Sequence, residues 1–193
     1  AQSPLLRLKT LEKTFHTDSG AAVCALKDIS LSVAAGRFVT IVGPTGCGKT
    51  TLLNIIAGLE KPTAGKCILA DGLKLGRNIA YVFQHYTLFP WATVLQNITF
   101  GPLMRKNPKK DAKHNARKLL QEVGLQQFEN AYPHELSGGM RQRAAIAQAL
   151  AIKPSLLLMD EPFGALDDST RTALQRTLSD LARRQRMTVI FVT

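Results

Sequence analysis

The chain has 193 residues, is 45% hydrophobic and carries a formal charge of +11. It is long enough to bury one substantial core. No run approaches the roughly 18 consecutive apolar residues of a membrane span, so we expect a globular protein that stays in water. The cysteines, which have no paired spacing, predict neither a disulfide framework nor a zinc site and fit a reducing compartment; they are Cys24, Cys47 and Cys67.

The positive charge is compatible with several kinds of partner. Basic proteins are attracted to nucleic acid, to nucleotides and to the anionic inner face of a membrane. Seven of the basic residues lie between Arg105 and Lys118. The plainest interpretation of such a run is a solvated helix face, so charge alone does not choose among these classes.

The elements alternate along the chain. An apolar, β-rich run at 37–43 ends in glycine and is followed by a helical pattern at 48–57. Short apolar runs at 67–72 and 78–83 predict two more strands, the first closed by an Asp-Gly turn. From about residue 94 to 151 the pattern is helical, with one helix ending at Gly124 and another beginning near Ser137.

Two further strands, at 155–160 and 187–192, flank a helix that Asp167 or Asp168 is placed to cap. Because strands alternate with helices, the predicted fold class is α/β, with a mainly parallel sheet covered on both faces and an inserted helical lobe. The expected organisation is a core in two segments, 1–87 and 152–193, separated by a helical subdomain at 88–151.

A glycine-rich loop follows the strand at 37–43. The segment "GPTGCGKT", residues 43–50, matches G-x-x-x-x-G-K-[ST] in full and opens a helix, which is the context the motif requires. Its glycines let backbone N–H groups converge on phosphate oxygens at a helix N-terminus. In that arrangement Lys49 reaches the β and γ phosphates and the Thr50 hydroxyl ligates Mg²⁺. A chance glycine-rich turn is the alternative.

Two acids, Asp160 and Glu161, end the strand at 155–160, where ligands gather in open α/β sheets. Asp160 suits a water-mediated hold on Mg²⁺, and Glu161 is placed to orient or deprotonate an attacking water. Gln84 follows the predicted strand at 78–83 and can contact the metal or the water. The plain alternatives are an acid pair that caps a turn and a surface glutamine.

The segment "LSGGMRQR", residues 136–143, predicts a second anion site. Ser137 can cap the following helix, while Gly138 and Gly139 leave backbone N–H groups uncovered. One nucleotide cannot easily occupy two such sites on opposite lobes of one subunit, but two subunits arranged head to tail would bring them together. A serine that only caps its helix is the alternative.

In this order, "GPTGCGKTT", "VFQ", "LSGGMRQR", "LLLMDEP" and "ALD" resemble the ATPase subunit of an ATP-binding-cassette (ABC) transporter over nearly the whole chain. The resemblance implies a P-loop NTPase fold with an antiparallel β edge and an inserted α-helical subdomain. It also implies ATP and Mg²⁺ as cofactors and a homodimer with two ATP at its interface. The resemblance places these residues at the nucleotide: Phe15 on adenine; Gly43, Pro44, Thr45, Gly46, Cys47, Gly48, Lys49, Thr50 and Thr51 around the phosphates; Ser137, Gly138 and Gly139 in trans; and Asp167 in the D-loop. It assigns catalysis to Glu161, Gln84 and Lys49, and the metal to Thr50, Gln84 and Asp160.

The segments "FPWATVLQNITFG", "YPHELSGGMRQR" and "FGALD" are similar to importer ATPases for nitrate, sulfonates and taurine. This branch implies membrane-spanning permease subunits as direct partners and an extracytoplasmic solute-binding protein that acts indirectly. It also implies a peripheral location on the cytoplasmic face of the inner membrane. Nucleic acid is not expected as a partner. The corner at 89–91 would receive a permease helix, or it is ordinary core packing. Met140 stands where many members have glutamine.

Two rival functions stay open at this point: a soluble ABC-type ATPase acting on nucleic acid or ribosomes, and a nucleotide-gated regulator without turnover. In the family, a switch histidine follows the strand at 187–192, and this sequence stops at Thr193. We therefore expect a C-terminally truncated chain in which ATP binding survives better than hydrolysis.

Overall fold

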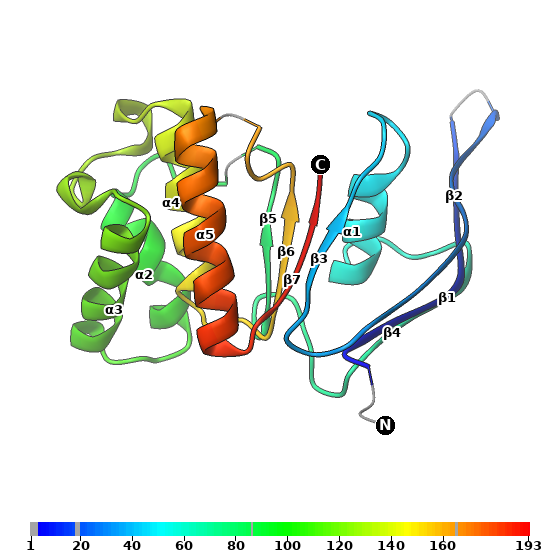
Figure 1. Ribbon diagram of the computed structural model, residues 1–193, viewed down its shortest axis with the longest axis horizontal. Coiled ribbons are helices and arrows are strands. Elements are labelled where there is room, and N and C mark those ends of the chain that lie inside the picture. The colour runs from blue at the N-terminus through cyan, green and yellow to red at the C-terminus, as the bar shows by residue number, and fades with distance from the viewer. Residues whose placement is uncertain (1–3, 18–19, 86, 165) are drawn as a thin grey trace.

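The computed structural model describes residues 4–17, 20–85, 87–164 and 166–193, and a parallel sheet forms the centre of the fold (Figure 1). Within these residues the strand order of this four-stranded sheet is β3-β7-β6-β5. Its strands are β3 (Phe38–Ile41), β5 (Ile79–Val82), β6 (Leu156–Asp160) and β7 (Thr188–Val192). Every neighbouring pair is parallel, which confirms the sheet predicted from alternating strands and helices.

A second, antiparallel sheet lies at the far side of Figure 1 from the helical lobe. Its order is β2-β1-β4 in the described part of the chain. Its strands are β1 (Leu6–His16), β2 (Ala22–Val33) and β4 (Ala64–Leu69). The strand expected at 67–72 is therefore displaced toward the N-terminus, because its pairing with β1 runs from Leu6 opposite Leu69 to Glu12 opposite Ala64.

The helices begin and end largely where the sequence indicated. They are α1 (Lys49–Ala57), α2 (Val94–Met104), α3 (Lys109–Glu122), α4 (Gly138–Leu150) and α5 (Asp168–Gln185), with short 3₁₀ turns η1 (Gln126–Phe128) and η2 (Pro133–Glu135). Gly124 follows α3 in the left-handed region at φ +67°. Ser137 and Asp167 are the N-caps of α4 and α5, as expected from their hydroxyl and carboxylate acceptors.

The central sheet separates two hydrophobic cores. Every residue of β6 is buried, and its side chains alternate between the two sides. Leu156 and Leu158 pack with α1 and the antiparallel sheet, whereas Leu157 and Met159 pack with α4, α5 and the helical lobe. The glycine-rich loop that precedes α1 and the "LSGGMRQR" segment that opens α4 are consequently attached to opposite faces of one sheet (Figure 1).

The basic run at 105–118 is only partly a solvated face. Arg105 lies at the end of α2, where its guanidinium donates to the carbonyls of Ile152 (2.6 Å), Gly76 (2.9 Å) and Arg77. Burial lowers the pKa of this guanidinium. Arg117 forms a two-pronged ion pair with Glu129 at 2.8 and 3.0 Å. Arg105 thus ties the helical lobe to the loops at the base of the sheet, and the lysines make up most of the solvated charge.

None of the helices in the described ranges is both long enough and apolar enough to cross a membrane.

Candidate nucleotide-binding site

The glycine-rich loop joins β3 to α1 with the geometry of a phosphate loop. Gly46 and Gly48 take φ values of +81° and +91°, which L-residues rarely adopt, and α1 begins at Lys49. Lys49 is 9% exposed, and its Nζ donates to the carbonyls of Gly43 (2.6 Å) and Pro44 (2.9 Å). The ammonium is therefore held inside the loop, where phosphate oxygens can replace these carbonyls as acceptors.

The other predicted residues of the loop are more exposed than Lys49. The structure leaves these side chains or backbones exposed at the surface: Pro44, Thr45, Gly46, Cys47 and Thr50. Thr51 is half-buried in the first turn of α1. At the opposite edge of the loop the Gly43 N–H donates to the Thr193 carbonyl at 3.4 Å, which fixes the loop beside the end of β7.

Gly48→Ala should damage the loop far more than Gly46→Ala. A Cβ at Gly48 would meet the Ala25 carbonyl oxygen in addition to the strain of positive φ, whereas a Cβ at Gly46 meets nothing within 4 Å. We expect a loss of about 2–4 kcal/mol in unfolding free energy for Gly48→Ala and about 1–2 kcal/mol for Gly46→Ala. Urea unfolding of the two variants measures the difference. Equal losses would contradict the steric argument.

The predicted acids and the glutamine come together at the carboxyl ends of β5 and β6. Asp160 is the last residue of β6 and is 3% exposed. Glu161 follows with a positive φ of 45°, and its N–H donates to the Val192 carbonyl at 3.1 Å. The Gln84 amide nitrogen donates to Glu161 Oε2 at 3.0 Å. Glu161 also lines an open pocket of about 420 Å³, so its carboxylate is held by Gln84 and remains accessible.

The electrostatics around Asp160 favour a cation. Burial is the main cause that raises the pKa of this carboxyl, and the charge of Glu161 raises it further, while the Thr50 hydroxyl and Lys49 lower it. The Tyr81 hydroxyl is buried without a hydrogen-bond partner, and burial together with the charge of Asp160 raises its pKa. A cation next to Asp160 would offset the cost of burying its negative charge.

The donor set fits Mg²⁺ that arrives with a nucleotide. A hydroxyl from Thr50, a carboxylate from Asp160 and an amide oxygen from Gln84 are hard oxygen ligands, and Mg²⁺ is commonly bound by one or two carboxylates plus substrate phosphates. In the part of the chain that the structure describes, no group of three or more His, Cys, Asp or Glu residues could hold a metal without such phosphates. The residues present therefore suit a metal shared with the ligand.

The predicted second anion site would lie at the start of α4. The Ser137 hydroxyl accepts a hydrogen bond from the Met140 N–H at 3.3 Å and is exposed, and Gly138 and Gly139 form the first helical turn. Leu136, 4% exposed, anchors this end of the helix in the lobe's core. Because α1 packs into the other core, the structure keeps this site apart from the phosphate loop of the same subunit.

Asp167 is engaged in its own helix. Its Oδ1 accepts hydrogen bonds from the Ser169 hydroxyl (2.7 Å) and the Thr170 N–H (2.9 Å), and the bond from Ser169 is the main cause that lowers its pKa. This geometry explains the N-cap, and the expected D-loop contact stays a prediction. Ala165, the first residue of "ALD", lies outside the described residues.

Phe15 lies near the end of β1 and is 39% exposed. A neighbour that was not predicted lies against it: the Lys13 ammonium is 4.6 Å from the centroid of the Phe15 ring. Lys13 in turn pairs with Glu60, which follows α1. The spacing of Lys13 and Phe15 was an available signal, because residues two apart in a strand share a face.

A glycine-rich phosphate loop between β3 and α1 of the parallel sheet, an acid pair at the end of β6 and a serine-capped glycine pair that opens a helix of the helical lobe are together typical of an ATP-binding-cassette ATPase. Residues 26–164 match the family described as "ABC transporter". The chain belongs to this family and is an ABC-type ATPase whose substrate is Mg-ATP.

Three relatives and one solved structure show the extent of the similarity. MJ0412, an ABC transporter ATP-binding protein of Methanocaldococcus jannaschii, is 50% identical to this chain. The nitrate import ATP-binding protein NrtD of Synechocystis sp. is 45% identical, and the taurine import ATP-binding protein TauB of Roseobacter denitrificans is 44% identical. Each alignment covers 97% of this chain and 71% of the relative. The dimeric ATP-binding cassette MJ0796 bound to ADP and Pi superimposes with a TM-score of 0.88 and 34% identity, over 97% of this chain and 87% of that one.

Proposed function

We propose that this ATPase is the energy-supplying subunit of an importer for a small solute of the nitrate, sulfonate or taurine class. One observation carries the proposal: the loop between β5 and α2 bears both Gln84, which is hydrogen-bonded to Glu161, and Trp91, which is 76% exposed. A movement at the nucleotide can therefore be passed along this loop to a partner bound at its other end. The nitrate and taurine relatives match almost equally well, so the solute is proposed only as a class.

The residues that would surround the phosphates have different roles in hydrolysis. Lys49 binds the β and γ phosphates, and Mg²⁺, when bound, neutralises developing charge on them. Gln84 holds the Glu161 carboxylate by its hydrogen bond, so that Glu161 orients a water and accepts its proton as the water attacks the γ phosphate. Asp160 and Thr50 supply oxygen ligands on the metal side of the site.

The complete site requires two subunits in this proposal. Ser137 is exposed, Gly138 and Gly139 are half-buried in the first helical turn, and together they offer an anion site that their own phosphate loop does not reach. In a head-to-tail homodimer each γ phosphate would be covered by the partner's copy of this helix start. Two ATP molecules would then hold the dimer closed, and hydrolysis would release it. The dimeric cassette MJ0796 supports this arrangement.

The corner at 89–92 is held by a fully buried amide. Asn97 is 0% exposed; its nitrogen donates to the carbonyls of Phe89 (3.2 Å), Ala92 (3.0 Å) and Thr93 (3.0 Å), and its oxygen accepts from the Phe89 N–H (2.7 Å). This amide fixes the backbone while Trp91 points outward. The corner is therefore a rigid platform for an exposed aromatic side chain, the type of residue that most often dominates binding energy at interfaces.

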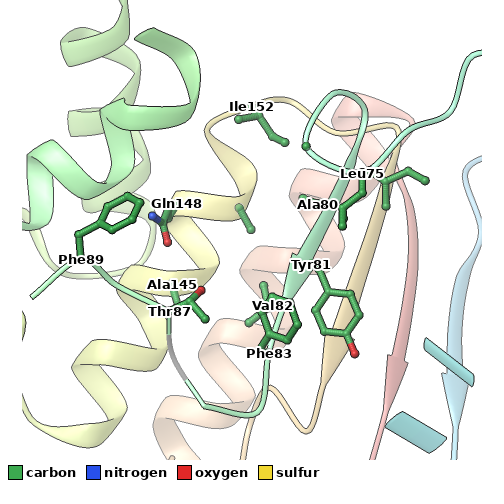
Figure 2. Close-up of a pocket in the computed structure, with 13 residues that line it drawn as sticks. Leu75, Ala80, Tyr81, Val82, Phe83, Thr87, Phe89, Ala145, Gln148 and Ile152 are labelled. Carbon is green, nitrogen blue, oxygen red and sulfur yellow. The ribbon is translucent and has the colours of Figure 1, made fainter. Parts of the chain in front are cut away.

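A pocket of about 370 Å³ adjoins this corner (Figure 2). Its walls come from β5, the loop after it, and α4, and they include Tyr81, Phe83, Phe89, Ala145 and Ile152. None of its lining residues belongs to the phosphate loop. An apolar groove beside an exposed tryptophan suits the apolar face of a helix, which supports a permease segment as its occupant at the cytoplasmic face of the membrane. The solute-binding protein would act on the far side, through the permease.

Trp91→Ala should weaken the association with the permease subunits about 10-fold and leave ADP affinity unchanged. The affinity is measured by titrating the ATPase onto detergent-solubilised permease from the same source, with ADP binding followed by calorimetry. Phe128→Ala is the matched control, because Phe128 is also exposed (39%) but lies on η1. Equal permease affinity in the two variants would overturn the docking site.

The charge of +11 favours one alternative, a soluble ABC-type ATPase acting on nucleic acid. Such a protein would bind RNA or DNA with a steep salt dependence, and the nucleic acid would stimulate hydrolysis. The importer proposal predicts no such stimulation at physiological salt.

A further inference from the structure

Three residues of β1 share the strand face that packs toward α1. After the register shift between Leu8 and Leu11, Leu11 is fully buried, and Lys13 and Phe15 follow it at two-residue spacing. The side chain of Lys13 is only 13% exposed, although lysine is rarely buried without a partner. Its burial therefore calls for acceptors, and the structure provides them.

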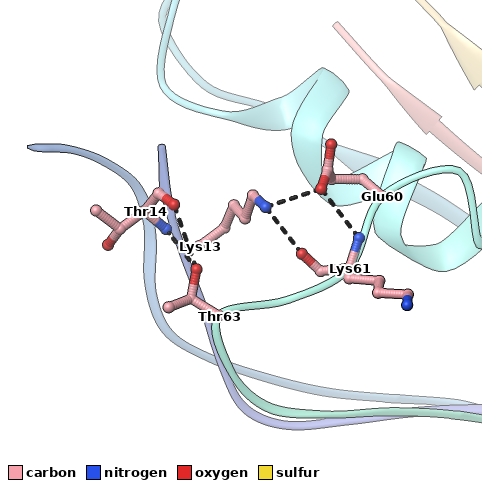
Figure 3. A network of polar contacts seen from close by, with 5 residues as sticks. All are labelled: Lys13, Thr14, Glu60, Lys61 and Thr63. Carbon is pink, nitrogen blue, oxygen red and sulfur yellow. Dashed lines mark hydrogen bonds and ion pairs between the residues drawn. The ribbon is translucent and has the colours of Figure 1, made fainter. Parts of the chain in front are cut away.

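The Lys13 ammonium is held by the segment that follows α1 (Figure 3). It donates to Glu60 Oε1 at 2.8 Å and to the Lys61 carbonyl at 3.0 Å. The same carboxylate oxygen accepts from the Lys61 N–H at 3.0 Å, so Glu60 is fixed by its own backbone. The hydrogen bond from Lys13 is the main cause that lowers the pKa of Glu60. Lys13 is thus a charged group with a defined position.

The neighbouring strand contacts are equally well defined. The Thr63 hydroxyl accepts from the Thr14 N–H at 3.0 Å and donates to the Thr14 carbonyl at 3.3 Å (Figure 3). The Thr63 N–H also donates to the Glu12 carbonyl at 2.8 Å. These bonds hold the backbone on both sides of Lys13 against the segment after α1. Phe15 is the next residue along the same face of the strand, so its backbone lies close to this fixed point.

Lys13 covers one face of the Phe15 ring. A distance of 4.6 Å from the ammonium nitrogen to the ring centroid is within the range of a cation–π contact. With that face occupied, a flat ligand can stack only on the opposite face. The ring is also ordered before any ligand arrives, which lowers the entropy cost of stacking.

We propose that Lys13 is a positioning residue for the nucleotide base: held by Glu60, it fixes the Phe15 ring relative to the phosphate loop and directs the base to the uncovered face. The physical link is α1 itself. The helix starts at Lys49 in the phosphate loop, and the Glu60 N–H is bonded to the Asn54 carbonyl of its last turns at 3.2 Å. Phosphates and base are thereby set a fixed distance apart. The inference rests on the stacking of adenine on Phe15, which the family resemblance implies.

The test compares ADP with pyrophosphate, which carries phosphates but no base and needs no catalytic variant to prevent hydrolysis. Calorimetric titrations in the presence of Mg²⁺ are made on the unmodified chain, Lys13→Met, Lys13→Arg, Phe15→Leu and the double variant. We expect Lys13→Met to weaken ADP binding about 3- to 10-fold and to leave pyrophosphate binding unchanged. Lys13→Arg should stay within about twofold, because a guanidinium also stacks on aromatic rings and pairs with a carboxylate. Lys9→Met, on an exposed position of the same strand, is the control and should change neither affinity.

The outcomes separate the possible failures. In the Phe15→Leu background, Lys13→Met should have no further effect on ADP. If Lys13→Met weakens ADP and pyrophosphate equally, or still weakens ADP without the Phe15 ring, Lys13 has only a structural role and the inference fails. If Phe15→Leu weakens ADP but Lys13→Met does not, the inference alone fails. If Phe15→Leu itself leaves ADP affinity unchanged, the base site is elsewhere and the assignment of Phe15 fails first.

Discussion

Glu161→Gln should lower steady-state ATP hydrolysis by about 10²- to 10⁴-fold, the range that a general base contributes, and leave ATP binding intact. Glutamine keeps the size of the side chain and still offers an oxygen to the Gln84 amide, which donates to Glu161 Oε2 at 3.0 Å. It removes the carboxylate that accepts a proton from water. Phosphate release measures turnover, and fluorescence of a labelled ATP analogue measures binding.

Gln84→Ala is the matched variant for this prediction, because it removes the hydrogen bond to Glu161 and keeps the carboxylate. We expect a smaller loss of turnover than in Glu161→Gln. The slow variant also tests the dimer: with saturating ATP, Glu161→Gln should sediment as a dimer. Turnover equal to that of the unmodified chain would place the base elsewhere, and a monomer under these conditions would contradict the two-subunit site.

The parallel half of the fold was predictable because its signals are local. The strands at 155–160 and 187–192 are continuous apolar runs, and both are buried on both faces in the structure. The antiparallel sheet was harder to predict. A register shift in β1 between Leu8 and Leu11 interrupts the two-residue alternation that marks a strand. The bounds of β4 depend on this partner, so its predicted range was displaced.

The candidate site shows the same division between local and long-range information. The phosphate loop and the caps of α4 and α5 depend on neighbouring residues, and the sequence motifs located them. The Lys13–Glu60 pair joins residues 47 positions apart, and Arg105 reaches the Ile152 carbonyl from the same distance along the chain. No short motif encodes such contacts. For this reason the basic run was assigned to a solvated face, although Arg105 and Arg117 have specific partners.

Lys49→Met should weaken ATP binding at least about 100-fold, since hydrogen bonds to charged groups contribute about 1.5–3 kcal/mol each and Lys49 would reach two phosphates. The stability of the ligand-free protein should change little. In the ligand-free protein the ammonium donates hydrogen bonds to the carbonyls of Gly43 and Pro44, and Lys49 is 9% exposed. The substitution therefore loses two hydrogen bonds but also removes a nearly buried charge.

This balance makes Lys49→Met diagnostic, because affinity and stability should respond differently. ATP affinity is measured by calorimetry and unfolding free energy by urea titration. Lys61→Met is the control, because the backbone carbonyl of Lys61 and not its ammonium takes part in the contact with Lys13. If Lys49→Met lowered affinity and stability together, the ammonium would act mainly as a structural brace of the loop. If it changed neither, the phosphates would bind outside the loop, because a nearly buried cation at the start of α1 cannot be neutral toward an anion placed within its reach.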